Sequence, residues 1–226
     1  AEFACALLNS QPMGFYQPAQ IIRDAQKHGV SVEPIDANKS AWDCRVDYSQ
    51  TYTHSTLRLG LRLINSLRGD HASALQRSVS TYGDTSSIKE LWERNTDISR
   101  STLKTLARAH AFSSITKDRR EAHWNIQALP SNPAPLDSLL TEREETRATR
   151  LPSTSPQRDM FEDYAMTGFS LKAHPLQFIR PLLSDRNVYT AEALSAKYAM
   201  PTSSIVSVAG IAITRQRPGT AKGVVF

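Results

Sequence analysis

The chain has 226 residues, with 27 Lys and Arg against 22 Asp and Glu and a formal net charge of +5. This length suits one or two domains, and the slight basic excess permits an anionic partner without requiring one. No apolar run approaches the roughly 20 residues of a membrane span, so no spanning helix is expected.

The amino-terminal part predicts two helices and two short strands. Residues 1–29 have a helical pattern, with Pro18 in the first turn of the second helix and Gly29 just past its end. Apolar residues alternate with others over 30–35, and leucines do so over 57–63. Alternation with a period of two predicts a strand in both places.

The middle of the chain has helical periodicity up to about residue 129. Ser87 and Glu90 have the spacing of a capping box, and Ser99 or Ser101 is expected to cap the next helix. Asp118 is expected to open the helix after that. The aromatic side chains expected in the core, rather than as platforms for bases, are Trp42, Trp92, Trp124, Tyr16, Tyr164 and Phe178.

The following segment, residues 130–157, is polar, charged and rich in proline, which predicts a flexible linker. Helices are expected near 160–166, 175–183 and 191–198. None of these stretches has the repeat period of a solenoid.

The end of the chain predicts a β-hairpin. Residues 206–213 are apolar and β-branched, Pro218 and Gly219 suit a tight turn, and a second strand begins at Lys222. A lone two-stranded ribbon is marginal in water and leaves open edges. We therefore expect the chain to be a piece of a longer protein.

Five blocks of sequence carry a resemblance to one family. The terminal stretch VAGIAITRQRPGTAKGVVF resembles the opening hairpin of the oligonucleotide-binding (OB) domain of bacterial C-family DNA polymerases, relatives of the DNA polymerase III alpha subunit. The start, including QPMGFY, is similar to the end of the fingers region in the error-prone, ImuC-type branch. The blocks LRLGLRLINSL, 98–120 and TGFSLKAHPLQFIR match in order, which leaves a gap at about 130–155.

The resemblance implies a mainly α fold with short strands (α+β), in which a helix-hairpin-helix region precedes the first hairpin of an OB-type β-barrel. The expected divisions are the end of the fingers (1–56), the helix-hairpin-helix DNA-binding region (57–129), the linker (130–157), a helical connector (158–202) and the truncated start of the OB domain (203–226).

The resemblance also implies an activity for the parent protein. It would be a DNA-directed DNA polymerase that copies past lesions during damage-induced mutagenesis, with Mg²⁺ held by aspartates of the palm. In the family the palm precedes the fingers, so those aspartates are expected upstream of Ala1. The chain lacks zinc-ligand spacing, a nucleotide-phosphate loop and a nucleophile elbow. We expect it to be catalytically inert, with no catalytic residue, metal or cofactor of its own.

The first hairpin turn is expected at INSLRG, residues 64–69. Such a turn points backbone N–H groups at a phosphate, and replicative relatives carry two glycines there. Here Ser66 and Arg68 stand where glycines would. Their side chains hinder close approach of DNA, whereas the Arg68 guanidinium is itself a candidate phosphate contact, so a binding turn and a purely structural turn both stay open.

The second hairpin is expected around residues 97–102. Arg100, Lys104 and Arg108 follow at i, i+4 and i+8, which places them on one helical face as candidate DNA contacts. Their alternative role is an ordinary solvated face. His110 stands where replicative relatives often have glycine, and is expected to lie at the helix end, against the C-terminal dipole.

The terminal turn supplies a third candidate contact. Arg215, Arg217 and Lys222 flank it, and OB folds bind single strands with basic loops and aromatic platforms. Most of the strands that would carry those platforms lie beyond this sequence, so binding by this loop alone is expected to be weak.

The expected partner is primer–template DNA, gripped without sequence preference, and the parent is expected to engage accessory mutagenesis proteins and the sliding clamp. The alternatives are a protein-interaction scaffold of a mutagenesis complex and the matching part of a replicative polymerase alpha subunit. Cys5 and Cys44 need no disulfide, and neither a signal peptide nor a membrane partner is indicated, so the cytoplasm is the expected location.

Overall fold

The computed structural model describes residues 1–13, 16–48, 55–130, 152–196 and 205–212, together with 215–217, 219–220, 223 and 225. Two compact units divide the chain between Lys172 and Ala173. The elements of the first unit are α1 (Glu2–Asn9), α2 (Pro18–Lys27), β1 (Ser31–Glu33), β2 (Arg45–Tyr48), β3 (Ser55–Arg58), the 3-10 helix η1 (Leu61–Leu63), α3 (Gly69–Tyr82), α4 (Ile88–Arg94), α5 (Arg100–Arg108), α6 (Arg119–Gln127) and α8 (Pro156–Thr167). Those of the second unit are α9 (Pro175–Asp185), β4 (Val188–Tyr189), α10 (Ala191–Ala196) and β5 (Ser207–Val208).

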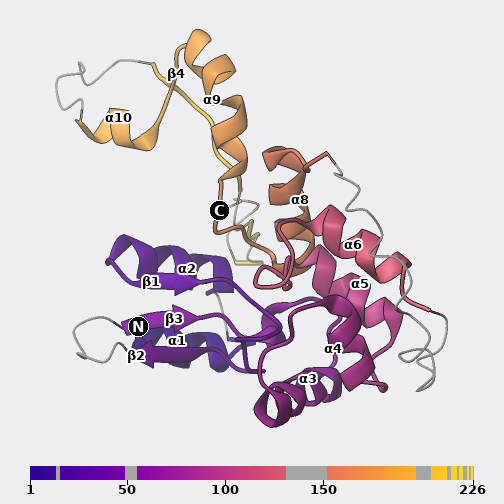
Figure 1. Cartoon of the computed structure of the whole chain (residues 1–226). Helices are drawn as coiled ribbons and strands as arrows, with labels where there is room; N and C mark the ends of the chain where they lie inside the picture. Colours follow the sequence, from indigo (N-terminus) through magenta and orange to yellow (C-terminus); the bar gives the residue numbers. More distant parts are fainter. Residues whose placement is uncertain are drawn as a thin grey trace. The chain divides into compact units, whose positions relative to one another are not determined.

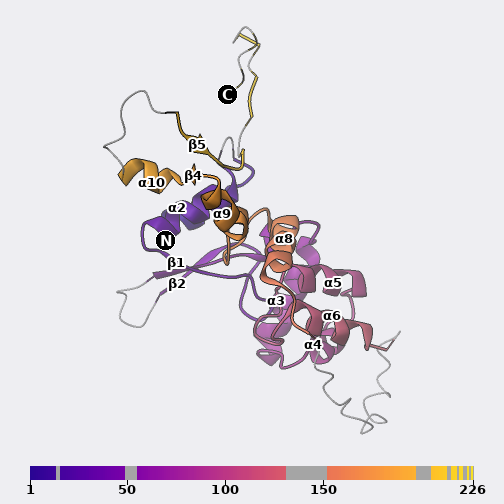
Figure 2. The ribbon, with the colours of Figure 1, turned by 90° about the horizontal axis from the view of Figure 1, so that it is seen from above.

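A small open sheet lies at one end of the first unit, and helices α3 to α6 lie at the other (Figures 1 and 2). The strand order is β1-β3-β2, with β1 parallel and β2 antiparallel to β3. Leu57 of the central strand is fully buried between Val32 and Val46, its partners in register. Helices α1 and α2 pack on this sheet, which gives the amino-terminal part its own share of the core.

Helices and short strands together confirm the α+β class expected from the sequence. Helix α2 begins at Pro18, and Gly29 beyond its end has φ +79°, in the left-handed region that glycine enters freely. Of the helices described, none combines the length and apolarity that crossing a bilayer would require.

The strand predicted over 57–63 is wrong in its second half, because β3 ends at Arg58 and Leu61–Leu63 forms η1. The reason lies at Gly60, where a Cβ atom would stand 2.4 Å from backbone atoms of Trp42 and Asp43. The two backbones meet too closely for an ordinary strand to continue. The alternation of leucines reflects burial on both sides of this crossing rather than one extended segment.

Side-chain caps start three of the central helices as the sequence predicts. Ser87 accepts a hydrogen bond from the Glu90 N–H, and Asp118 accepts one from Glu121 N–H at 2.9 Å. Ser99, rather than Ser101, caps α5. The capping box at α4 extends one residue further, because the Glu90 carboxylate accepts hydrogen bonds from the N–H and the hydroxyl of Ser86, the residue before the N-cap.

The prediction that the aromatic residues lie in the core holds for Trp92 but is wrong for Trp124 and Tyr16. Trp92 is 5% exposed, whereas Trp124 is 53% and Tyr16 63% exposed. Helix α6 buries Ala122 and Ile126, and Trp124 projects from the opposite side of the helix.

A buried polar cluster joins the sheet end of this unit to the helical end. The Asp36 carboxylate, on a residue only 3% exposed, accepts hydrogen bonds from Asn38 N–H, from the Ser113 hydroxyl and from both the N–H and hydroxyl of Ser114. The Asn38 side chain continues the cluster to Thr85. These bonds fix the loops around the central helices relative to the sheet.

The second unit contains α9, α10 and the pair β4 and β5. The strand expected over 206–213 is too long, since among the described residues of this stretch only Ser207–Val208 pairs, and its partner is the earlier strand β4, in parallel. This two-residue pair is open and its residues Ser207 and Val208 are exposed. The predicted second strand, which begins at Lys222, falls largely outside the described residues.

Candidate nucleic-acid interface

The first hairpin turn runs from η1 into α3. Ser66 has φ +65°, a left-handed conformation that glycine adopts without cost, whereas Arg68 has an ordinary extended backbone with φ −87° and ψ 143°. The serine therefore occupies a position shaped for glycine, and the arginine does not. Only one of the two glycine replacements strains the turn.

The Arg68 side chain is exposed but has a partner two residues away. Its Nε donates to Asp70 Oδ1 at 3.0 Å and its Nη2 to Asp70 Oδ2 at 2.6 Å. Asp70 Oδ1 also accepts the His71 N–H at 3.0 Å. The hydrogen bond from Arg68 lowers the pKa of the Asp70 carboxyl, which therefore stays ionised at neutral pH.

The predicted basic face of α5 is largely engaged within the molecule. Arg100 donates to the carbonyl oxygens of Leu129 and Pro130, just after α6. Arg108, 48% exposed, donates to Glu162 Oε2 of α8 at 3.0 Å. Lys104 is half-buried, and its ammonium has no hydrogen-bond or ion-pair partner among the residues that the structure describes.

His110 lies at the end of α5, as expected, but not as a cation. Its φ of +58° is left-handed, a conformation that glycine adopts more readily than histidine. Burial is the main cause that lowers its pKa to about 4, with Lys172 and Arg119 adding to the effect. At neutral pH the imidazole is therefore uncharged, and the expected interaction with the helix dipole is absent.

Arg119 is an important residue that sequence reasoning missed. It is 4% exposed and donates to the carboxylates of Asp159, at 2.9 Å, and Asp163, both on α8. It also donates to the backbone oxygen of Arg108 at 2.9 Å. The sequence did carry a signal for Arg119. A basic residue in the first turn of a helix is unfavourable to the helix dipole, so its presence there indicates a stabilising partner elsewhere.

The N-terminal turns of α3 and α5 meet directly. His71 Nδ1 and Thr102 Oγ1 lie 3.0 Å apart, and each belongs to the first turn of its helix. The second helices of the two hairpins are thus joined where their backbone N–H groups begin. The contact therefore places two helix N-termini, which favour anions, beside each other.

The terminal basic residues lie in the second unit, and Arg215 and Arg217 are exposed there. Lys222 lies outside the described residues. Nothing in the described part of this loop tests its contact with a nucleic acid, so all three stay predictions.

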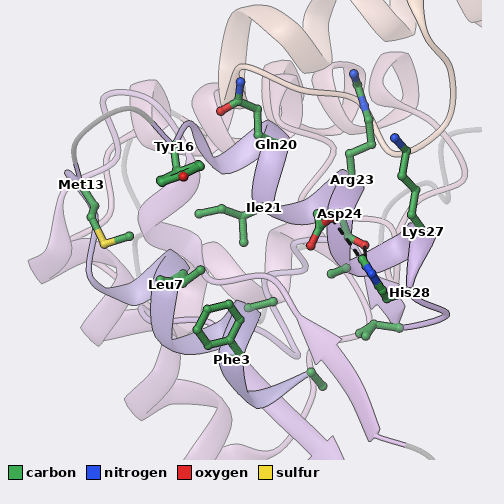
Figure 3. Close-up of a pocket in the computed structure, with 14 residues that line it drawn as sticks. Phe3, Leu7, Met13, Tyr16, Gln20, Ile21, Arg23, Asp24, Lys27 and His28 are labelled. Atoms are coloured by element: carbon green, nitrogen blue, oxygen red, sulfur yellow. Dashed lines mark hydrogen bonds and ion pairs between the residues drawn. The ribbon is translucent and has the colours of Figure 1, made fainter. Parts of the chain in front are cut away.

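A groove of about 930 Å³ between α1 and α2 was not foreseen from the sequence. Phe3, Leu7, Met13 and Ile21 are among the apolar side chains around it (Figure 3). Arg23 and Lys27, on one side of α2, point away from these side chains (Figure 3). The groove is therefore apolar with a charged edge, which also includes Asp24 and His28.

Two consecutive hairpins whose second helices meet at their N-terminal turns form a helix-hairpin-helix region within the first unit. A family model described as "Helix-hairpin-helix motif" matches residues 29–122. The resemblance to error-prone DNA polymerases is confirmed over the whole chain. The chain is 40% identical over 235 residues to "Error-prone DNA polymerase 2" of Rhizobium meliloti, and the match covers 99% of this chain and 21% of that protein.

Two further relatives agree. The "Error-prone DNA polymerase" of Methylococcus capsulatus is 39% identical over 243 residues, covering 100% of this chain and 22% of the relative. The "Error-prone DNA polymerase" of Alkalilimnicola ehrlichii is 38% identical over 228 residues, covering 100% of this chain and 21% of the relative. The chain thus spans about a fifth of the length of the relatives it matches.

Proposed function

We propose that the chain is the DNA-binding portion of an error-prone DNA polymerase, and that the parent protein carries out DNA-directed synthesis past lesions in damage-induced mutagenesis. The observation that carries this proposal is the junction of the α3 and α5 N-terminal turns through His71 and Thr102. It lies in a helix-hairpin-helix region, within a chain similar throughout to error-prone polymerases.

The proposed interaction is with the phosphate backbone. Helix N-termini and basic side chains position a protein on DNA without reading sequence, and their contribution falls as salt rises. Lys104 is the foremost candidate, because its ammonium has no partner among the described residues. Arg68, Arg100 and Arg108 would each give up an existing bond to bind phosphate.

Catalysis is proposed for the parent and not for this chain. Within the described residues, no three His, Cys, Asp or Glu side chains are grouped so that they could hold a metal ion. The Mg²⁺ implied for the polymerase is proposed to be held by other parts of the parent protein. Their proposed contribution is to bind and orient DNA, in the cytoplasm.

A second candidate function is protein docking. The observation that favours it is the apolar groove between α1 and α2, beside which Phe3 is 77% exposed and Tyr16 63% exposed. Accessory mutagenesis proteins and the sliding clamp are the proposed partners of the parent. Retention of one of them by the chain without DNA, and loss of retention in Phe3→Ser, would favour this function.

Fluorescence anisotropy with labelled primer–template and single-stranded DNA tests the main proposal. We expect binding that favours primer–template and weakens steeply between low and physiological salt. Absence of binding even at low salt would contradict DNA gripping by this chain and favour the docking function.

A further inference from the structure

The carboxylate of Asp70 joins the Arg68 guanidinium to the first turn of α3. It accepts two hydrogen bonds from Arg68, at 3.0 and 2.6 Å, and one from the His71 N–H in the first turn of α3. A planar guanidinium binds a carboxylate and a phosphate in the same two-pronged manner. Asp70 therefore presents to Arg68 the same kind of partner that DNA would offer.

The pair is accessible to solvent and local in sequence. The side chains of Arg68 and Asp70 are 71% and 57% exposed, so neither is fixed by burial. The two residues are two positions apart, which lets the pair form whenever α3 starts at this point. A phosphate approaching the turn must displace Asp70 and face its negative charge.

The second hairpin differs at the matching point. The first turn of α5 contains no acidic residue, whereas that of α3 contains Asp70. Both helices have an extended N-cap residue, and their first turns meet through His71 and Thr102. Ser99 caps α5 with its side chain, whereas Arg68 does not cap α3. Asp70 thus places a negative charge at the first turn of α3 that the first turn of α5 lacks.

We propose that Asp70 limits the affinity of the first hairpin for nucleic-acid phosphates, because it holds Arg68 in an ion pair and keeps a negative charge beside the N-terminal turn of α3. This inference rests on the proposed DNA-binding function. It assigns phosphate binding mainly to the second hairpin and leaves the first as a weak, restrained contact.

The test compares Asp70→Asn with a matched variant in the same chain. Asparagine keeps an oxygen that can accept the His71 N–H, so the start of α3 is preserved while the charge is removed. Asp84→Asn is the control, because Asp84 is also half-exposed and paired with a cation, Lys39, so its loss changes the net charge equally.

Affinity for primer–template DNA is measured across a salt series for each variant. We expect Asp70→Asn to tighten binding about threefold or more at low salt, and to steepen the plot of log affinity against log salt by about 0.9, as for one added phosphate contact. Asp84→Asn should change affinity by less than about 1.5-fold, since it frees no cation at the hairpin.

Arg68→Ala supplies the decisive comparison. In the wild-type background it should weaken binding less than about twofold, whereas in the Asp70→Asn background it should remove the whole gain. Equal affinities for Asp70→Asn and Asp84→Asn would overturn the inference and leave the DNA-binding function standing. Failure of every variant to bind at low salt would overturn both, and thermal melts confirm that each variant is folded.

Discussion

In the first hairpin the basic side chain pairs with a neighbour, whereas in the second it bonds with distant parts of the chain. Arg68 meets Asp70 two residues away. Arg100 reaches carbonyl oxygens 29 and 30 residues further on, and Arg108 reaches Glu162, 54 residues further on. The first arrangement survives wherever the local helix forms, while the second requires α6 and α8 to be in place. The two turns therefore depend on different levels of structure.

The largest expected effect is the loss of stability when the contact that holds α8 to the second hairpin is removed. Arg119→Met should destabilise the chain by about 3 kcal/mol, because it leaves the partly buried carboxylates of Asp159 and Asp163 without their cation. Urea denaturation measures this loss. Arg120→Ala, next to it in α6, removes a single hydrogen bond to the Pro152 backbone oxygen and should cost about 1 kcal/mol or less. Equal losses would show that Arg119 is not the link.

The second test uses pH and acts on the end of α5. In the unfolded chain His110 has an ordinary pKa near 6.5, and burial lowers its pKa to about 4 in the folded chain. The unfolded state thus binds more protons between these values, so stability is present above pH 6.5 and falls as pH drops toward 4.

We expect this loss to be about 1–2 kcal/mol, after allowance for partial exposure of the ring. His110→Asn keeps a residue that tolerates left-handed backbone and does not titrate. Chemical denaturation at several pH values should therefore give a flatter stability profile for the variant. Parallel profiles would exclude His110 as the source.

A third test acts on the first hairpin. Ser66→Gly should stabilise the chain by up to about 1 kcal/mol, because Ser66 is held at φ +65° and glycine removes that strain. The same change at Ser101, inside α5, should destabilise by about 0.5–1 kcal/mol. Thermal melts of both variants measure the contrast. Destabilisation by Ser66→Gly would mean that the serine side chain contributes a contact that outweighs the strain.

The smallest expected effect concerns DNA. Lys104→Ala should weaken primer–template binding about threefold and lower the salt dependence by about 0.9, as for one lost phosphate contact, without loss of stability. Arg100→Ala should instead lower the stability of the fold, since it removes the bonds to Leu129 and Pro130. Anisotropy and melting curves separate the two. Unchanged binding by Lys104→Ala would remove the α5 face from the proposed interface.

Local signals predicted much of the fold. Pro18 and Gly29 bound α2, and Ser87 and Asp118 cap their helices, because each of these residues acts within a single turn of chain. The leucine alternation after residue 57 predicted too long a strand. At Gly60 the backbone passes close to the backbone of Trp42, and a contact between segments so far apart cannot be read from a local pattern. The prediction that Trp124 is buried was wrong, because the hydrophobicity of a side chain does not show which side of its helix packs against a neighbour.

The candidate site divides in the same way. The sequence alone determined the order of the helices, their caps, the resemblance to error-prone polymerases and the spacing of Arg100, Lys104 and Arg108, since these depend on residue type and short-range geometry. Only the tertiary structure decided which cations have partners, that Arg119 is buried against α8, and that His71 meets Thr102. Those contacts join residues far apart in the chain, and their energies arise when packing removes water and brings the charges together.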